Sequence, residues 1–118
     1  MKKIKVIKPW GYFQILESKK DYKIKKIYVK PFEKLSLQRH NSRSENWVIV
    51  KGKAKITLGN KIYNLNQGKS IFVPKLKKHR IENNSKKELI VLELQLGSYL
   101  GEDDIIRYKD KYKRKVSK

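Results

Sequence analysis

The chain has 118 residues, with 31 Lys or Arg against 11 Asp or Glu and a net charge of +20 at pH 7, so we expect one domain over residues 1–118. Only five of the basic residues are arginine, and the lysines are spread along the chain without a stripe, which argues against a nucleic-acid partner. There is no cysteine, no signal-peptide segment and no apolar stretch near the roughly 20 residues that span a bilayer, so we exclude disulfides and a membrane partner and expect a cytoplasmic protein.

Two segments near the N-terminus are predicted to form a turn and a strand. Residues 8–12 contain Pro and Gly, which indicate a turn that presents an aromatic pair over the core. Residues 22–29 alternate in character and include β-branched side chains, which predicts a strand that ends at Pro31.

The segment 35–50 carries the most informative pattern of the chain. Residues 35–40 are predicted as a strand with Ser36, Gln38 and His40 on one face, because strand side chains two residues apart point the same way. The polar residues 41–45 then reverse the chain before the apolar strand 47–50.

Further short strands are predicted at residues 54–58, 61–65 and 70–73. They are separated by the turn signals Gly59-Asn60 and Asn66-Gln67-Gly68, and the last strand ends at Pro74. Strands that recur every eight to twelve residues predict an all-β sandwich or barrel, and a jelly roll buries its sheet faces without helices.

The C-terminal third contains the strongest strand pattern, at residues 88–96. Its even-numbered face is apolar from residue 90 to 96, and we expect this face to be core; the other face carries Glu93 and Gln95 and either meets water or lines a polar cavity. Three acidic residues, 102–104, precede an apolar pair as in the first turn of a helix. We therefore expect a short C-terminal helix, followed by a frayed end at 113–118.

Two motifs contain four potential metal ligands. The first is Gln38-x-His40-x4-Glu45-x6-Gly52, and the second is Gly68-x5-Pro74-x4-His79-x3-Asn83. The chain has two histidines, and both fall on these motifs. If the motifs meet in space, Gln38, His40, Glu45 and His79 would bind one metal ion. The alternatives are structural histidines and a Glu45 at the rim of the site.

These spacings resemble the paired motifs of the cupin family. More narrowly, KPWGYF, LSLQRHNSRSENW, FVP with HRIEN, and GSYLGEDDIIRY resemble the cupin domain of type II phosphomannose isomerases, which follows a mannose-1-phosphate guanylyltransferase domain in those bifunctional enzymes. The resemblance covers residues 8–114 and implies an all-β cupin (RmlC-like) jelly-roll barrel. Two family glycines are replaced by Phe32 and Leu76, and Gln38 replaces the first histidine of the usual pair. Type I phosphomannose isomerases hold zinc with Gln, His, Glu and His, so this last departure fits the resemblance.

The resemblance implies a mannose-6-phosphate isomerase, which interconverts mannose 6-phosphate and fructose 6-phosphate through an enediolate. A divalent ion would stabilise the developing negative charge as a Lewis acid. Zinc is the expected cofactor, because two histidines and a carboxylate are a common catalytic zinc set, and Mn, Fe, Co or Ni are alternatives.

The reaction also needs a general base and a group that holds the phosphate. Glu93 and Glu82 are the candidate bases, and strand alternation favours Glu93 if its face lines the cavity. Arg43, between His40 and Glu45, and Arg80, next to His79, are candidates to bind the phosphate; the alternative for both is an ordinary surface arginine.

Two other functions stay open at this point. One is a cupin that acts on another sugar phosphate or a nucleotide sugar, and the other is a non-catalytic sugar-binding cupin. The expected partner is a small-molecule sugar phosphate, and we also expect a homodimer, formed through exposed sheet edges.

Overall fold

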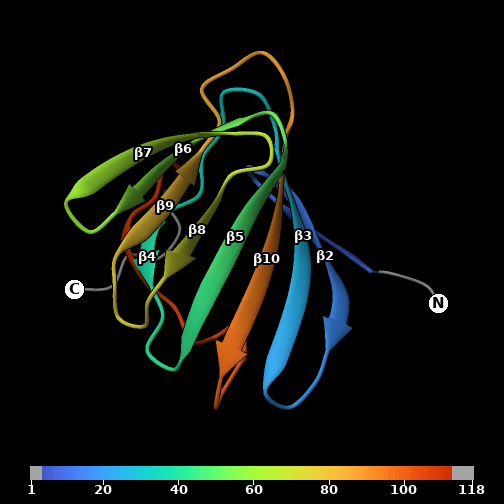
Figure 1. The fold of residues 1–118 in the computed structure, drawn as a ribbon, viewed down its shortest axis with the longest axis vertical. Coiled ribbons are helices and arrows are strands. Elements are labelled where there is room, and N and C mark those ends of the chain that lie inside the picture. The colour runs from blue at the N-terminus through green and yellow to red at the C-terminus, as the bar shows by residue number, and fades with distance from the viewer. Residues whose placement is uncertain (1–3, 113–118) are drawn as a thin grey trace.

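The computed structural model describes residues 4–112, which form two antiparallel β-sheets packed face to face as a jelly roll (Figure 1). The larger sheet has the order β1-β2-β3-β10-β5-β8, with β1 Lys5–Lys8, β2 Gly11–Ser18, β3 Tyr22–Val29, β10 Leu89–Gly97, β5 Arg43–Lys51 and β8 Ser70–Val73. The smaller sheet has the order β11-β4-β9-β6-β7, with β11 Ile106–Lys109, β4 Leu37–Arg39, β9 His79–Glu82, β6 Lys53–Leu58 and β7 Lys61–Asn66. The predicted all-β jelly roll is confirmed.

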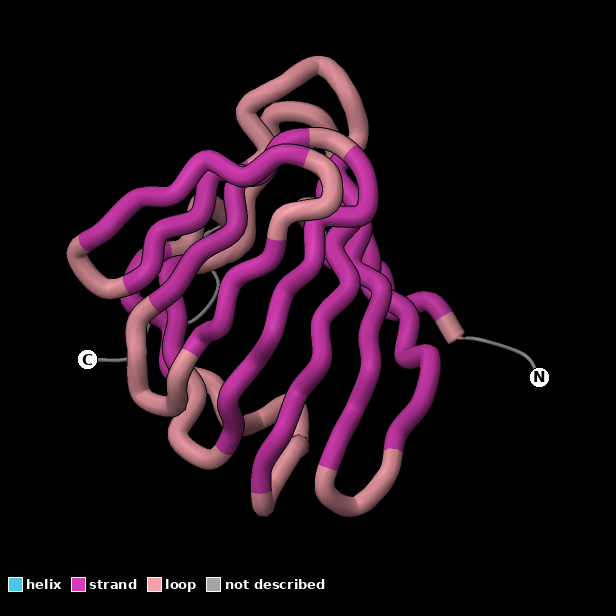
Figure 2. Tube along the Cα trace, viewed as in Figure 1, coloured by secondary structure: helices cyan, strands magenta, loops and turns pink. Residues whose placement is uncertain are grey.

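The expected C-terminal helix is wrong, because residues 4–112 contain strands and loops without a helix (Figure 2). Glu102 Oε2 lies 2.7 Å from Lys25 Nζ, and the Asp104 carboxylate accepts hydrogen bonds from the backbone N–H groups of Asn41 and Ser42, both at 2.9 Å. These acids therefore contact distant segments instead of starting a helix. The chain continues as β11, and the expected frayed end at 113–118 lies outside the described residues.

The apolar core lies between the two sheets, where alternate residues of each strand point inward. The predicted hairpin at Gly59-Asn60 is confirmed by the antiparallel pairing of β6 with β7. Asn83, the last residue of the second motif, is fully buried, and its Nδ2 donates to three backbone carbonyl oxygens. This motif residue therefore serves the fold, because it joins its own segment to the backbone of residues 29–30 and of Lys87.

The two faces of β10 are the reverse of what we expected. Glu93 and Gln95 are buried between the sheets, whereas the apolar even-numbered residues 90–96 form the outer face, where Leu96 is 40% exposed. The interior accepts the polar side chains because they hydrogen-bond to each other, with Gln95 Nε2 donating to Glu93 Oε2 at 2.8 Å. Of the two alternatives for the mixed face, the structure therefore has the polar cavity.

Two residues that replace family glycines adopt a left-handed backbone conformation. Phe32 has φ 60° and Leu76 has φ 68°, and this region costs a residue with a side chain roughly 1–2 kcal/mol. Both side chains are largely exposed, so packing offsets little of that strain. Leu76 is nevertheless held in place, because its backbone N–H donates to the His40 carbonyl oxygen at 2.9 Å.

Replacing Leu76 with glycine should raise the free energy of unfolding by about 0.5–1 kcal/mol, because relief of left-handed strain exceeds the added chain entropy of glycine. Leu96→Gly is the matched control, because Leu96 is also partly exposed but lies in regular strand conformation. The free energy of unfolding of Leu96→Gly should fall by about 0.5–1 kcal/mol. Urea unfolding followed by circular dichroism measures both changes. Destabilisation by Leu76→Gly would contradict the strain argument.

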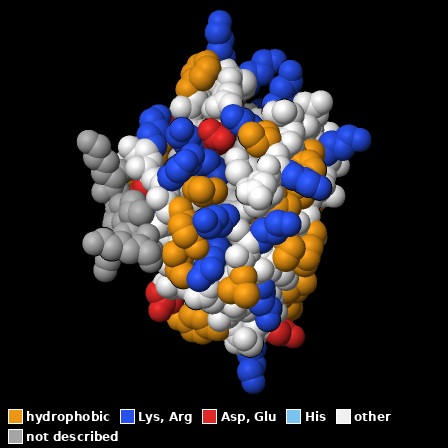
Figure 3. Space-filling view, turned by 90° about the vertical axis from the view of Figure 1, so that its left-hand side faces the viewer, with side chains coloured by type: hydrophobic (Ala, Val, Ile, Leu, Met, Phe, Trp, Pro, Cys, Tyr) orange, Lys and Arg blue, Asp and Glu red, His pale blue; other side chains and the backbone are white. Residues whose placement is uncertain are grey.

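The basic residues are distributed over the surface of the molecule. Figure 3 shows Lys and Arg side chains scattered among hydrophobic ones on one face, without a single stripe. This matches the sequence, in which lysines occur singly or in pairs along the chain. Among the described residues, no helix has the length and apolar character needed to cross a membrane.

Candidate metal centre and adjoining cavity

Strand β5 presents three polar side chains to the interior. Arg43, Glu45 and Trp47 are spaced two residues apart, so they share one face of the strand, and all three are buried. Arg43 Nε donates to Glu45 Oε2 at 2.7 Å, and Trp47 Nε1 donates to Glu45 Oε1 at 2.9 Å. Both oxygens of the Glu45 carboxylate are therefore held in fixed directions.

The two histidines meet Glu45 from the other sheet. Pairing of β4 with β9 places Gln38 directly opposite His79, so these two side chains lie on the same face. His40 Nε2 lies 3.2 Å from Glu45 Oε2, and His79 Nε2 lies 4.0 Å from Glu45 Oε1. His40, Glu45 and His79, which we name the ligand cluster, each offer one ligand atom within 4.8 Å of the others. The fold therefore brings the two motifs together.

Backbone carbonyl groups select the tautomer of both histidines. His40 Nδ1 lies 2.6 Å from the Asp104 carbonyl oxygen, and His79 Nδ1 lies 2.9 Å from the Lys77 carbonyl oxygen. Because a carbonyl oxygen only accepts, each Nδ1 carries the hydrogen. Burial lowers the pKa of His40 to about 3, with the Arg43 charge as the second cause, and burial also lowers the pKa of His79 to about 4. Both rings are neutral at pH 7 and direct the Nε2 lone pair at Glu45, which is the orientation of metal-binding histidines.

The ligand cluster fits a divalent metal ion. His79 Nε2 is buried and has no hydrogen-bond partner among the described residues. His40 Nε2 and Glu45 Oε2 are two acceptors only 3.2 Å apart, an arrangement that calls for a positive charge beside them. Two imidazoles and a carboxylate are a catalytic zinc set, and Gln38, which lines the same cavity as His40, offers a neutral oxygen. Other first-row divalent metals suit the same donors.

Arg43 supplies the positive charge in this structure. Its Nη2 lies 3.1 Å from His40 Nε2, and its Nε is bonded to Glu45. Since neutral His40 has no hydrogen on Nε2, this atom accepts the hydrogen bond from Arg43. The guanidinium therefore contacts two of the three residues of the ligand cluster.

Glu93 is a second buried carboxyl group next to the ligand cluster. Its Oε1 accepts a hydrogen bond from Trp47 Nε1 at 3.1 Å, and its Oε2 accepts one from Gln95 Nε2 at 2.8 Å. Burial raises the pKa of Glu93 to about 7, and the Glu45 carboxylate is the second cause. A carboxyl group with a pKa near neutrality can take up or release a proton at pH 7.

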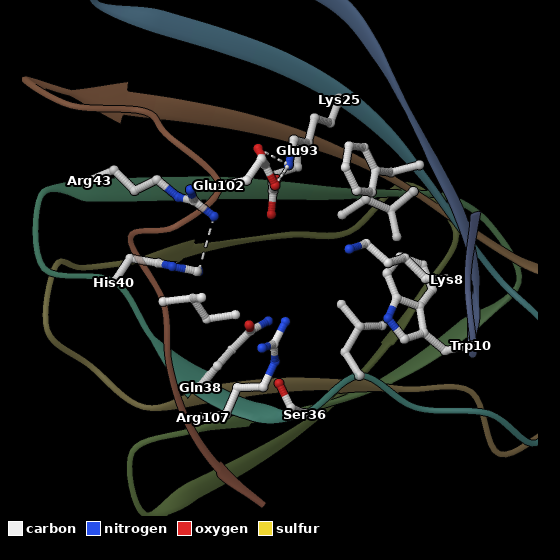
Figure 4. Close-up of a pocket in the computed structure, with 14 residues that line it drawn as sticks. Lys8, Trp10, Lys25, Ser36, Gln38, His40, Arg43, Glu93, Glu102 and Arg107 are labelled. Carbon is white, nitrogen blue, oxygen red and sulfur yellow. Dashed lines mark hydrogen bonds and ion pairs between the residues drawn. The ribbon is translucent and has the colours of Figure 1, made fainter. Parts of the chain in front are cut away.

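A cavity adjoins the ligand cluster, and Figure 4 shows several charged side chains in its wall. His40, Arg43 and Glu93 lie on one side of it. Gln38, Ser36 and Arg107 lie together below them, and Lys8 enters from the direction of Trp10. The cavity therefore combines a candidate metal centre, two carboxyl groups (Glu93 and Glu102) and four basic residues (Lys8, Lys25, Arg43 and Arg107), and the excess of basic groups suits a small anionic ligand.

Of the residues proposed from the sequence, six lie around the ligand cluster and its cavity: Gln38, His40, Arg43, Glu45, His79 and Glu93. The structure does not bring Glu82 and Arg80 to this site. They alternate along β9 with the buried His79 and Ile81, so they face the other way. Arg80 Nε donates to the Leu35 carbonyl oxygen at 3.0 Å, and Glu82 lies 3.9 Å from both Lys34 and Lys55.

Several residues of the site were not predicted from the sequence. Lys8, Lys25, Glu102 and Arg107 line the cavity, and Trp47 donates a hydrogen bond to Glu93. Period-two spacing from Glu45 could have indicated Trp47, as it placed Gln95 on the face of Glu93. Arg107 was not identified because a helix was predicted near it, whereas its position opposite Gln38 depends on the pairing of strand β11 with β4. No local signal indicated Lys8.

Residues 1–110 match the family described as Mannose-6-phosphate isomerase C-terminal. The chain belongs to this family. Membership in the Mannose-6-phosphate isomerase C-terminal family confirms the resemblance to the cupin domain of type II phosphomannose isomerases, which was proposed from the four sequence blocks.

Two curated relatives are much longer than this member of the Mannose-6-phosphate isomerase C-terminal family. The xanthan biosynthesis protein XanB of Xanthomonas campestris pv. campestris (strain B100) is 42% identical over 110 residues, which cover 93% of this chain and 24% of XanB. Mannose-1-phosphate guanylyltransferase 2 of Escherichia coli O157:H7 is 45% identical over 108 residues, which cover 92% of this chain and 22% of that protein. The chain spans about a quarter of the length of these relatives.

The names of these relatives contradict the enzymatic identity that we expected for the chain. The relatives are named for mannose-1-phosphate guanylyltransferase and for xanthan biosynthesis, and neither is named a mannose-6-phosphate isomerase. The identification of the chain as a mannose-6-phosphate isomerase is therefore wrong. It equated a domain with a whole enzyme, whereas the matched region is a small part of longer proteins.

A comparison with solved structures supports the fold independently. The S161A mutant of Bacillus subtilis oxalate decarboxylase OxdC matches with a TM-score of 0.76 and 20% identity, covering 88% of this chain and 29% of that chain. At this identity the likeness concerns the fold alone. Together with the two-sheet topology, it confirms the cupin jelly roll.

Proposed function

We propose that this domain carries out metal-dependent aldose–ketose isomerisation of a phosphorylated hexose, with mannose 6-phosphate and fructose 6-phosphate as the pair to assay. The observation that carries the proposal is the buried ligand cluster, with two neutral histidines and Glu45, beside the carboxyl group of Glu93 in a cavity lined by cations. The proposal concerns the chemistry of one domain, because the chain spans about a quarter of its relatives' length.

Isomerisation moves a proton between C1 and C2 of the sugar while negative charge develops on a substrate oxygen. Gln38 and the ligand cluster would hold a divalent ion, which when bound supplies Lewis-acid stabilisation of that charge. Glu93 faces the cavity and is positioned to take the proton from one carbon and return it to the other. Trp47 and Gln95 orient Glu93 by donating to its two oxygens.

Glu93→Gln should lower turnover roughly 100-fold or more, which is the contribution of a general base, while zinc affinity changes only a few-fold. A coupled assay that follows fructose 6-phosphate, with and without a chelator, measures turnover, and calorimetry measures zinc binding. Glu82→Gln is the matched control on the outer face of β9 and should keep full activity. Unchanged turnover in Glu93→Gln would remove Glu93 as the base, and turnover that survives chelation would remove the metal.

A non-catalytic sugar-phosphate-binding domain is the second candidate. It is favoured by Arg43, which in this structure bonds to His40 Nε2 and Glu45 Oε2, two of the atoms that a metal ion would need. Zinc-loaded protein that binds mannose 6-phosphate without converting it would support this candidate. Binding and turnover measured on one preparation therefore separate the two functions.

The homodimer stays a prediction, as does the cytoplasmic location. The exposed edges that could pair are β1 and β8 in the larger sheet and β11 and β7 in the smaller one. Sedimentation equilibrium over a range of protein concentrations measures the number of chains in the assembly.

A further inference from the structure

The proposed function requires a subsite for the phosphate group, and neither arginine first considered for it is well placed. Arg80 lies on the outer face of β9 and donates to the backbone carbonyl oxygens of Leu35 and Lys109. Arg43 faces the cavity but lies against the ligand cluster, with Nε and Nη2 bonded to Glu45 and His40 and with Nη1 buried and without a hydrogen-bond partner among the described residues. A phosphate group at Arg43 would lie against the ligand cluster, so the subsite is sought elsewhere in the cavity wall.

Arg107 enters the cavity next to the metal ligand Gln38. Strand β11 pairs with β4 so that Arg107 lies directly opposite Gln38, and directly opposite residues of paired strands share a face. Figure 4 shows the Arg107 guanidinium beside the Gln38 amide, with the Ser36 hydroxyl nearby. Ser36 is 1% exposed and lines the cavity, so its hydroxyl is shielded from bulk solvent.

Lys8 reaches the same space from the other sheet. Its Nζ lies 5.9 Å from the centroid of the Phe13 ring, and Phe13 is a buried residue that lines the cavity. Figure 4 shows the Lys8 ammonium pointing into the cavity from the side of Trp10. Arg107 and Lys8 thus approach one volume from two different strands, on the side away from Arg43.

We propose that Arg107 and Lys8, with the hydroxyl of Ser36, form a subsite for a phosphate monoester. The guanidinium and the ammonium group are donors only, and the planar guanidinium can bind two phosphate oxygens at once while the ammonium contacts another. Arg107 and Lys8 are also the cations of the cavity wall that lie on the side away from Arg43 and the ligand cluster. A sugar phosphate would thus place its phosphate at Arg107 and Lys8 and its sugar end toward the ligand cluster and Glu93.

Calorimetric titration with mannose 6-phosphate and with inorganic phosphate, in buffer of physiological salt, tests the subsite. Arg107→Met should weaken binding of both probes by roughly 10- to 100-fold, the worth of a charge-assisted hydrogen bond. Arg107→Lys should recover part of the loss, and Lys8→Met should weaken both probes in the same direction. Zinc affinity should stay within a few-fold in all three variants, which shows that the ligand cluster is intact.

Arg80→Met is the matched control, because it removes an equal charge from the outer face. If it weakens phosphate binding as much as Arg107→Met does, the anion is held by the overall charge of +20 and the subsite is refuted. Wild-type affinity of Arg107→Met for both probes refutes it as well. The phosphate subsite and the proposed function can fail separately. If Arg107→Met weakens phosphate binding but the wild type shows no isomerisation, the subsite is supported and the proposed function is refuted. If Arg107→Met isomerises as fast as the wild type at low substrate concentration, the proposed function is supported and the subsite is refuted.

Discussion

Replacing His79 with alanine should lower the affinity for zinc roughly 100-fold or more, because loss of a direct ligand exceeds the 10- to 100-fold cost of losing a residue that only supports one. His79 is 1% exposed, and its buried Nε2 has no hydrogen-bond partner among the described residues. Isothermal titration with Zn²⁺ measures the affinity. The variant should keep a β-sheet circular-dichroism spectrum, and turnover should fall with zinc binding.

Arg80→Ala is the control for this substitution, because it changes the neighbouring residue on the opposite face of β9 and should leave zinc affinity unchanged. Glu45→Gln provides a second variant that retains the side-chain volume if the cavity left by His79→Ala disturbs folding. It removes the only carboxylate of the ligand cluster and should lose zinc affinity to a similar extent. Folded variants that bind zinc like the wild type would show that the ion is held elsewhere.

The ligand cluster could be predicted because its residues have local signatures. Period-two spacing within a strand put Gln38 and His40 on one face, and both histidines of the chain fell on the two motifs. The meeting of the motifs could not be derived in this way, since it depends on the pairing of Gln38 with His79 across β4 and β9. Such pairing joins residues distant in sequence, and no local pattern encodes it.

Two errors have a common physical origin, which is that local sequence patterns do not report contacts with distant segments. On β10 the apolar pattern put the even-numbered face inside, whereas Glu93 and Gln95 are buried because they complete a hydrogen-bond network with Trp47. The acidic residues 102–104 resembled a helix start, but Asp104 accepts hydrogen bonds from the backbone N–H groups of Asn41 and Ser42. Functional interiors and tertiary capping therefore both override local propensity in this fold.

Replacing Arg43 with methionine should tighten zinc binding roughly tenfold, because Arg43 and the ion compete for one atom. Neutral His40 has a single lone pair on Nε2, and Arg43 Nη2 lies 3.1 Å from it. That lone pair can accept the hydrogen bond or bind zinc, but it cannot do both. The bond contributes about 1 kcal/mol, and repulsion between the guanidinium and a divalent cation adds to it, so the sum is close to the 1.4 kcal/mol that corresponds to a tenfold change.

Arg43→Met should also lower the free energy of unfolding of the metal-free protein, because the buried Glu45 carboxylate, 1% exposed, loses its ion-pair partner at 2.7 Å. Zinc stabilises only the folded state, so it should raise the Tm of Arg43→Met more than the Tm of the wild type. Arg80→Met removes an equal charge from the outer face and should bind zinc within twofold of the wild type, which separates local competition from the net charge of +20. If Arg43→Met binds zinc more weakly than Arg80→Met, then Arg43 positions Glu45 for the ion and does not compete with it.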